Sequence, residues 1–261
     1  MANVLLELNN LTRHFEGLRA VDDVSFIVEE GQIAAVIGPN GAGKTTLFNL
    51  VSGFLRPQAG GVRLADVDIT NRAPHRIAAL GLVRTFQLVR LFPEMTVLGN
   101  VLAGFHLHTR GGLGAAIVRL PGIREQERRI EREAMEILDF IGLADHADRK
   151  AGHLTYGQQR LLEIARGFAA GPRLFLLDEP AAGLNPAETE TLGKLIRAIR
   201  SRGVTVLFIE HDMNVVMTTA EKVIVLDFGR KIAEGTPEAV QRNPAVLEAY
   251  LGGVEAEPGH V

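Results

Sequence analysis

The residue types best suited to chemistry lie in the glycine-rich stretch GPNGAGKT, which runs from Gly38 to Thr45. It fits the pattern G-x-x-x-x-G-K-[ST] and comes directly after the apolar run IAAVI at 33–37. Glycines let backbone N–H groups curl around an anion, and the N-terminus of the helix expected next adds a positive end. The Lys44 ammonium adds a point charge for β- and γ-phosphates, and the Thr45 hydroxyl can ligate Mg²⁺. Although the chain has 28 glycines, about 0.01 chance matches are expected in this length, so the stretch predicts a phosphate-binding loop. The residues expected to bind the nucleotide here are Gly38, Pro39, Asn40, Gly41, Ala42, Gly43, Lys44, Thr45 and Thr46.

Two carboxylates follow a second apolar run, LFLL at 174–177, as Asp178 and Glu179. A buried strand that ends in two carboxylates is costly unless they meet a cation or hydrogen-bond donors. Beside a magnesium nucleotide, Asp178 would hold the metal through its water shell, and Glu179 would accept a proton from the attacking water or orient it. The alternative is a pair of carboxylates in an ordinary loop, and it loses weight because a phosphate-binding loop lies upstream.

Two further polar residues give weaker signals. His211 follows the apolar run VTVLFIE, at a strand end where open parallel sheets place their ligands. By itself, a histidine in that position is more often structural than catalytic. Gln87 stands where the sequence changes to a helical pattern, and by itself this polar residue indicates no function.

The stretch LTYGQ predicts the start of a helix, and its residues are Leu154, Thr155, Tyr156, Gly157 and Gln158. Thr155 and Gln158 have the T-x-x-Q spacing of a capping box, and the apolar residues that follow recur at helical spacing. The same stretch is an off-pattern variant of a phosphate-binding signature, since tyrosine stands where glycine is usual. Whether it only caps a helix or also grips a phosphate stays open from these residues alone.

Strands and helices alternate along the chain, and this pattern supplies the scaffold for these residues. Such alternation favours the α/β class, with a mostly parallel sheet covered on both faces. An N-terminal strand-rich layer is expected to interleave with this core, and an all-helical insertion is expected to follow Gln87. Strands are expected at 4–8, 22–32, 33–38, 60–69, 173–180, 204–212 and, as a hairpin, 221–236. Helices are expected at 46–54, 96–107, 124–142, from 155 onward, and at 188–203, 213–220 and 244–253.

Composition narrows the class of protein. The 261 residues are 46% hydrophobic and 23% charged, which is typical of a soluble globular protein with a sizeable core. A net charge of −3 gives no support to a nucleic-acid-binding face, and the lack of cysteine excludes disulfides and thiolate metal sites. No apolar run approaches the ~18 residues of a membrane span, so any membrane role is expected to come through a partner.

Taken in order, the motifs resemble those of an ABC-type nucleotide-binding subunit across essentially the whole chain. The order is GPNGAGKTT, RTFQLVRLF, LTYGQQ, LLDEP, AAGLNP and IEHD. Any one of these after the first is weak evidence, whereas all six in order are very specific. The similarity is closest to the ATPases of bacterial branched-chain amino acid importers, in particular the G-type member of that pair. The resemblance implies a P-loop NTPase (RecA-like) core with an antiparallel β subdomain and a helical insertion.

The resemblance also implies a role for matching positions. Phe15 would stack on adenine, with a core strand aromatic as the alternative. Gln87 would contact Mg²⁺ or water and report the nucleotide state to a membrane subunit, and His211 would contact the γ-phosphate. The implied catalytic residues are Glu179, His211 and Gln87, and the implied metal ligands are Thr45, Gln87 and Asp178.

A pair of ATPase subunits follows from the same resemblance. LTYGQ would bind ATP held by the other subunit, and the loop that crosses between subunits corresponds to Gly183, Leu184 and Asn185. Asparagine stands at 185 where many relatives have aspartate, which puts an aspartate-specific contact there in doubt. Two ATP molecules would hold two subunits face to face, and hydrolysis would let them separate.

The domain plan implied is a single ABC ATPase domain over 1–261. Its core and β subdomain would occupy 1–86 and 154–235, its helical signature subdomain 87–153, and its C-terminal helix and tail 236–261. ATP and Mg²⁺ are the implied ligands. The implied partners are membrane permease subunits, a second ATPase subunit and, indirectly, a periplasmic or extracellular solute-binding protein, without nucleic acid. The resemblance favours an F-type heterodimer partner for the second ATPase subunit, with a homodimer as the alternative. The implied location is peripheral, on the cytoplasmic face of the inner membrane.

Other functions stay open at this point. The same ATPase could serve a urea or amide importer, or an exporter of lipid-linked material. A soluble ABC ATPase acting in DNA repair or on ribosomes usually has a coiled-coil insertion or two fused cassettes, which this chain lacks. A simple P-loop kinase would have neither LTYGQ nor AAGLNP.

Overall fold

The structure is a computed structural model that describes residues 3–105 and 121–251. It divides the chain into two units. The first unit comprises Met1–Arg84, Arg173–Ala182 and Thr189–Val261, and the second comprises Thr85–Pro172 and Gly183–Glu188. Residues 106–120 of the helical subdomain expected at 87–153 lie outside the described residues, and so do residues 252–261 of the expected C-terminal tail.

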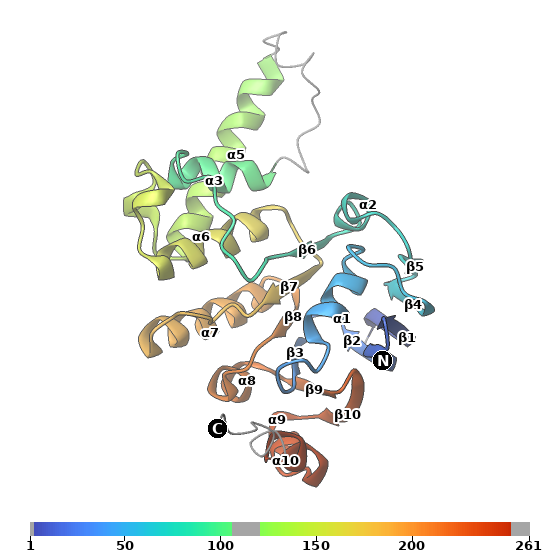
Figure 1. Cartoon of the computed structure of the whole chain (residues 1–261). Helices are drawn as coiled ribbons and strands as arrows, with labels where there is room; N and C mark the ends of the chain where they lie inside the picture. Colours follow the sequence, from blue (N-terminus) through green and yellow to red (C-terminus); the bar gives the residue numbers. More distant parts are fainter. Residues whose placement is uncertain (1–2, 106–120, 252–261) are drawn as a thin grey trace. The chain divides into compact units, whose positions relative to one another are not determined.

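The first unit contains a sheet of six strands in the order β10-β9-β3-β8-β7-β6 (Figure 1). Its middle strands β3, β8 and β7 are five-residue apolar runs in which every residue is buried, as expected for strands covered on both faces. Neighbours from β9 to β6 are parallel, whereas β9 and β10 form an antiparallel hairpin. The predicted α/β class with a mostly parallel sheet is therefore confirmed. The strands are β3 (Ile33–Ile37), β6 (Leu82–Arg84), β7 (Leu174–Asp178), β8 (Thr205–Ile209), β9 (Lys222–Asp227) and β10 (Arg230–Gly235).

An antiparallel sheet of four strands, in the order β2-β1-β4-β5, forms the N-terminal layer of the same unit. The strand predicted at 4–8 runs on to Phe15, and β-bulges interrupt its pairing with β2. Bulges break the alternation of buried and exposed residues on which a strand prediction depends. The strand predicted at 60–69 is two strands, because Ala65 turns the chain at a φ of +50°. The strands are β1 (Val4–Phe15), β2 (Leu18–Glu29), β4 (Ala59–Leu64) and β5 (Val67–Asp68).

Helix α1 follows the phosphate-binding loop, and its end is set by Gly53. This glycine has a φ of +77°, and a Cβ there would lie 2.5 Å from the carbonyl oxygen of Arg72. Only glycine therefore ends the helix in this way. The short elements α2, α9 and β6 were not predicted from the sequence. The helices are α1 (Lys44–Val51), α2 (Pro74–Ala78), α7 (Pro186–Ser201, which begins in the second unit), α8 (Met213–Thr219), α9 (Pro237–Gln241) and α10 (Pro244–Leu251).

The second unit is helical in its described part, and α3 and α5 both pack on α6. Gly104 ends α3, and a Cβ there would lie 2.3 Å from the carbonyl oxygen of Arg166 on α6. The two helix backbones approach closely at this point, which explains a glycine within a run rich in leucine and alanine. The helices are α3 (Val97–Gly104), α5 (Pro121–Phe140) and α6 (Tyr156–Ala169), with 3₁₀ turns at Ala144–His146 and Ala151–His153.

Candidate functional site

The phosphate-binding loop is packed so tightly at both ends that only glycine fits. Gly38 has a φ of +150°, and a Cβ there would lie 2.0 Å from the carbonyl oxygen of Leu226. Gly43 has a φ of +97°, and its Cβ would lie 2.0 Å from the carbonyl oxygen of Ala20. The backbones of β9 and β2 thus press against the loop. Glycine is required here by close approach as well as by dihedral angle.

Lys44 is the first residue of α1 and is buried, with 7% of its surface exposed. Its Nζ donates to the carbonyl oxygens of Gly38 at 2.6 Å and Pro39 at 2.9 Å. Burial lowers the pKa of Lys44, and the negative charge of Glu179 opposes that shift. Gly43 caps α1 without a side-chain bond, and the first turn holds no acidic residue. A cation and an uncapped helix N-terminus thus lie together at the loop, which is the combination that binds phosphate.

Asp178 ends β7 in a buried ion pair with Arg84. Arg84 Nη2 lies 2.7 Å from Asp178 Oδ2, and the two side chains are 5% and 4% exposed. Arg84 Nη1 also donates to Asn49 Oδ1 at 2.8 Å and to Ser52 Oγ at 2.9 Å. Arg84 therefore links the Asp178 carboxylate to Asn49 of α1 and to Ser52, the residue directly after α1. The predicted need of Asp178 for a cation is met within the protein.

Thr45 and Asp178 fit a magnesium ion only together with a nucleotide. Thr45 is exposed at the second position of α1, and its hydroxyl and the Asp178 carboxylate are the oxygen ligands that Mg²⁺ prefers. Among the described residues, no group of three or more His, Cys, Asp and Glu side chains could hold a metal. The donors present thus suit an ion whose other ligands are phosphate oxygens and water.

Glu179 and His211 follow two adjacent parallel strands. Asp178 of β7 is in register with Ile209 of β8, so the residues after them emerge at the same edge of the sheet (Figure 1). Glu179 has a φ of +45°, a left-handed conformation that is uncommon for a non-glycine residue, and its N–H donates to the Ile209 carbonyl at 3.1 Å. The His211 side chain is 61% exposed. A carboxylate and an exposed imidazole thus follow β7 and β8 at the edge of the sheet where β3 leads into the phosphate-binding loop.

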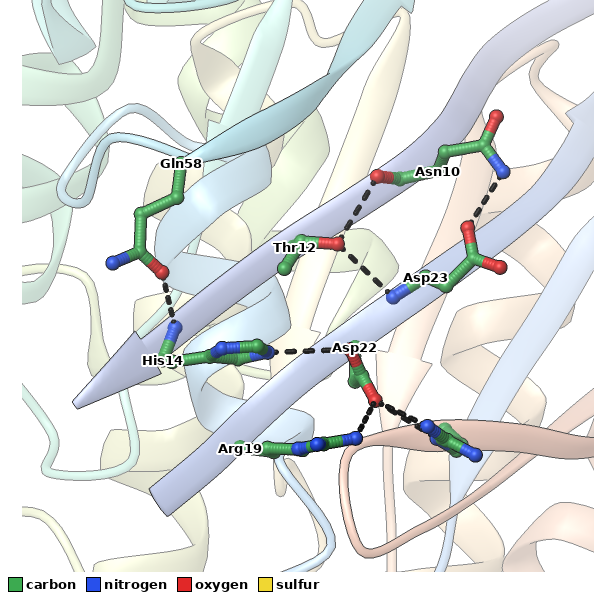
Figure 2. A network of polar contacts seen from close by, with 8 residues as sticks. Asn10, Thr12, His14, Arg19, Asp22, Asp23 and Gln58 are labelled. Atoms are coloured by element: carbon green, nitrogen blue, oxygen red, sulfur yellow. Dashed lines mark hydrogen bonds and ion pairs between the residues drawn. The ribbon is translucent and has the colours of Figure 1, made fainter. Parts of the chain in front are cut away.

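Phe15 ends β1 and is 37% exposed, so it is not a core aromatic. The guanidinium carbon of Arg13 lies 4.7 Å from the centre of its ring. The β1–β2 hairpin that carries Phe15 is held by Asp22 (Figure 2). The Asp22 carboxylate bonds His14 Nε2 at 3.2 Å and accepts from the Arg230 guanidinium at 2.7 and 2.9 Å. The Arg230 guanidinium lowers the pKa of Asp22, and His14 acts in the same direction, while burial opposes it. The further labelled contacts involve Asn10, Thr12, Arg19, Asp23 and Gln58.

A Phe15→Ala variant is expected to weaken ATP binding by about 1–3 kcal/mol, the usual worth of one base stacked on an aromatic side chain. Binding of tripolyphosphate, which has no base, should not change. Isothermal titration with both ligands measures the difference. Ile27→Ala is the matched control, because Ile27 on β2 is equally exposed at 37%. An equal loss of affinity for ATP and tripolyphosphate in Phe15→Ala would remove the stacking role.

The LTYGQ stretch begins α6 with the predicted capping box. Thr155 Oγ1 accepts from the Gln158 N–H at 3.3 Å, and Gln158 Oε1 accepts from the Thr155 N–H at 3.1 Å, so this prediction is confirmed. Gly157 cannot take a side chain without displacing its neighbour, because a Cβ there would lie 2.3 Å from Glu188 Oε1. Tyr156 is 46% exposed. Thr155 and Gln158 form the capping box, and the Tyr156 ring makes neither of its two hydrogen bonds.

The loop from Gly183 to Asn185 lies against this helix start, within the second unit. Gly183 has a φ of +78°, and a Cβ there would lie 2.9 Å from Tyr156 Cε1. Asn185 Oδ1 accepts from the N–H groups of Ala187 and Glu188, each at 3.0 Å, and its own N–H donates to Glu188 Oε2 at 3.0 Å. Asn185 therefore caps the first turn of α7, and the side-chain oxygen used is one that aspartate would also supply.

Asn185→Ala is expected to lower the free energy of unfolding by about 1 kcal/mol, because the first turn of α7 loses its cap. Asn185→Asp should keep the cap, since a carboxylate oxygen accepts the same N–H groups. Urea unfolding followed by circular dichroism measures both variants. Equal stability of wild type and Asn185→Ala, or an equal loss in both variants, would contradict the cap.

Gln87 belongs to the second unit, and its expected contact with the metal stays a prediction. The segment around it is fixed to α6 by a buried ion pair, Arg160 Nη1 to Glu163 Oε2 at 2.7 Å. Arg160 Nη1 donates to the Phe86 carbonyl at 2.8 Å, and the Arg90 N–H donates to Glu163 Oε1 at 3.1 Å. The backbone on both sides of Gln87 is therefore bonded to α6 within the second unit.

Three sets of residues with evident roles in this geometry were not predicted. They are Arg84, the pair Arg160 and Glu163, and Glu210, whose side chain is fully buried beside His211. A signal existed only for Glu210, which is a charged residue directly after the apolar run of β8. Local sequence does not show which partner such a charge meets.

The chain matches two family models. Residues 21–182 match the family "ABC transporter", and residues 230–256 match "Branched-chain amino acid ATP-binding cassette transporter". Within 3–105 and 121–251, no helix combines the length and apolar character needed to cross a bilayer.

Relatives resemble the chain along its length. The high-affinity branched-chain amino acid transport ATP-binding protein BraF of Pseudomonas aeruginosa is 48% identical, over 97% of this chain and 99% of that protein. The corresponding LivG protein of Escherichia coli K12 is 44% identical, with the same coverage. A crystal structure of an ABC transporter ATP-binding cassette in its ADP conformation is 35% identical, covers 95% of this chain and 99% of that chain, and has a TM-score of 0.83. With a nucleotide-binding loop, two strand-end carboxylates and a capped signature helix in place, the chain belongs to the ABC transporter family of ATP-binding ATPases.

Proposed function

We propose that this protein is the ATP-hydrolysing subunit of an importer for branched-chain amino acids and drives transport through membrane permease subunits. The observation that supports the cargo best is full-length similarity to proteins named for this transport, together with the match of residues 230–256 to the branched-chain amino acid cassette family. The phosphate-binding loop with its buried Lys44 supports the ATPase activity.

The proposed chemistry assigns each loop one task. The backbone of 38–46 and the Lys44 ammonium bind the phosphates of ATP, and Phe15 stacks on the adenine. Glu179 accepts the proton of the attacking water, and His211 contacts the γ-phosphate. Thr45 and Asp178 would hold Mg²⁺, which would supply positive charge against the phosphates. The Glu179 carboxylate acts on the Lys44 cation electrostatically, which supports a place for Glu179 beside the phosphates that Lys44 would bind.

The proposed assembly is a pair of ATPase subunits on the cytoplasmic face of the inner membrane. In the pair, residues 154–158 and the loop 183–185 contact ATP held by the other subunit, which is an F-type partner rather than a second copy. Residues 87–153 pass the motion to the permease, together with α6, which belongs to the same helical unit. A solute-binding protein outside the membrane delivers the amino acid. ATP favours the closed pair because it contacts both subunits only in that state.

The experiment that tests this proposal combines membrane association with transport. The tagged chain is expressed in its native host, membranes are solubilised, and co-purified proteins are identified by mass spectrometry. Uptake of labelled leucine, isoleucine and valine is then compared with uptake of urea and short amides in cells that lack the chain and in complemented cells. We expect a permease and a second ATPase to co-purify, and branched-chain amino acid uptake to be restored by wild type but not by Lys44→Ala.

Other outcomes assign a different function. Restoration of urea or amide uptake alone would replace the cargo and leave the ATPase role in place. Export of lipid-linked material would reverse the direction of transport. Recovery of the chain only with ribosomes or DNA-repair proteins, without any permease, would overturn the proposal as a whole.

A further inference from the structure

Glu210 is a buried carboxylate for which the proposed chemistry has no use. It follows β8, and its side chain is 0% exposed. A buried carboxylate is costly unless donors meet its oxygens. Here Oε1 accepts the Ala181 N–H at 2.7 Å, and Oε2 accepts the His211 N–H at 3.2 Å. Burial raises the pKa of Glu210, and the backbone N–H groups of Ala181, His211 and Asp212 oppose that rise.

The first of these bonds holds the turn that carries Glu179. Glu179 has a φ of +45°, and such a conformation persists only when its surroundings fix it. The turn is tied to β8 by the bond from the Glu179 N–H to the Ile209 carbonyl, and it is closed by a bond from the Ala182 N–H to the Glu179 carbonyl, both at 3.1 Å. The Ala181 N–H lies between these two, and Glu210 supplies its partner.

The second bond holds the loop that carries His211. Its N–H is bound by Glu210, and the next residue, Asp212, caps α8 by accepting from the Asn214 N–H at 2.8 Å. The backbone of His211 is therefore fixed from both sides, by a carboxylate before it and by a helix start after it. The Glu210 carboxylate thus bonds both its own neighbour His211 and Ala181, which lies 29 residues earlier in the sequence.

We propose that Glu210 is a positioning residue that fixes the Glu179 turn and the His211 loop in one arrangement through backbone hydrogen bonds. The two short bonds of Glu210 go to the backbone of the loops, and its Oε2 also lies 4.0 Å from His211 Nδ1, so Glu210 acts on where Glu179 and His211 stand. The proposal rests on the catalytic roles proposed for Glu179 and His211. A carboxylate suits this task because it has two acceptor oxygens and no donor, whereas an amide has only one acceptor oxygen.

A Glu210→Gln variant separates a positioning role from a merely structural one. Glutamine is isosteric, but its NH₂ group opposes one of the two N–H donors, so one loop loses its anchor. We expect kcat of the full-length chain to fall about 10- to 100-fold, because small displacements of catalytic groups have effects of that size. The KM for ATP should stay within about twofold, since the phosphate-binding loop makes no bond to Glu210. Glu210→Asp, which keeps both acceptor oxygens on a shorter stem, should recover part of kcat.

Glu221→Gln is the matched control at the opposite end of the sheet. Glu221 Oε2 accepts the Ile33 N–H at 3.1 Å, and Oε1 pairs with Arg200 at 3.0 Å. This variant also exchanges a carboxylate that binds a backbone N–H. The N–H belongs to Ile33 at the start of β3, whereas the Glu179 turn and the His211 loop follow the ends of their strands. We expect its melting temperature to fall while kcat and KM stay unchanged.

The outcomes distinguish this proposal from the one on which it rests. A Glu210→Gln protein with a lowered melting temperature and wild-type kcat would overturn the positioning role, and so would equal kcat losses in Glu210→Gln and Glu221→Gln. If Glu210→Gln does not fold, the kcat of Glu210→Asp decides, and a wild-type value there rejects the proposal. Glu179→Gln is assayed in parallel. If it turns over ATP normally, the catalytic assignment fails; if it is inactive while Glu210→Gln is normal, only the positioning role fails.

Discussion

Replacement of Glu179 by glutamine is expected to lower the ATP turnover rate by about 10²- to 10⁴-fold, the range by which a positioned general base accelerates a reaction. Glutamine has the same shape but cannot accept the proton of the attacking water. The turn itself should survive, because its bonds to Ile209 and Ala182 use the backbone of residue 179. ATP binding should not weaken, since the change removes a negative charge near Lys44 and the incoming phosphates. Phosphate release and nucleotide titration measure the two effects separately.

Glu190→Gln is the control for this variant. Glu190 lies on the exposed side of α7 and pairs with Lys194 four residues on, so the change removes the same charge away from the loops. With ATP, Mg²⁺ and the proposed F-type partner subunit present, Glu179→Gln is also expected to accumulate in a dimer in light scattering, because nucleotide that is not hydrolysed keeps the subunits closed. Wild-type phosphate release by Glu179→Gln would exclude Glu179 as the base.

Lys44→Ala is expected to raise the Kd for ATP by about 10- to 150-fold, which corresponds to a hydrogen bond to a charged group worth about 1.5–3 kcal/mol. Lys44 Nζ bonds the loop's own carbonyl oxygens at 2.6 and 2.9 Å, so the cation is already placed at the loop before phosphate arrives. Its removal leaves the phosphate charge without a partner at that point. Titration with ATP in the presence of Mg²⁺ measures the change.

Lys194→Ala is the matched control, because Lys194 is an exposed lysine with 66% of its side chain accessible and an ion pair of its own. Its Kd for ATP should equal that of the wild type. Circular dichroism shows whether Lys44→Ala is folded. We expect it to fold, because the substitution removes only two hydrogen bonds, both to carbonyl oxygens of the loop. A folded Lys44→Ala protein that binds ATP as the wild type does would exclude the phosphate-binding loop as the nucleotide site.

The strand–loop–helix setting of the phosphate-binding loop could be predicted because its information is local. An apolar run, a glycine pattern and a capping pair each specify structure within a few residues, and β3, the loop and the Thr155 cap all match the prediction. The short elements α2 and β6 could not be predicted in this way. A strand of three residues gains its stability from pairing with β7, and that partner lies about 90 positions later in the chain.

The partners of buried charges were also beyond local prediction. The sequence places Asp178 and Glu179 at a strand end, but Arg84 pairs with the first across 94 positions, and no nearby pattern announces it. Asn185 raised a different question, because its position could be assigned from the resemblance but many relatives have aspartate there. The hydrogen bonds answer part of that doubt: its side-chain oxygen caps α7, a task open to asparagine and aspartate alike.

The pairing of Arg84 with Asp178 gives the strand-end carboxylate a cationic partner within the protein. A bare carboxylate at the sheet edge would attract any divalent ion in the cell, whereas this one already has a guanidinium at 2.7 Å. If Asp178 helps to hold Mg²⁺ as proposed, a free metal ion would gain little there by itself, because the carboxylate already has a cationic partner. The proposed site would then favour the complex of metal and nucleotide, whose phosphates supply further charge and oxygen ligands, over the free ion.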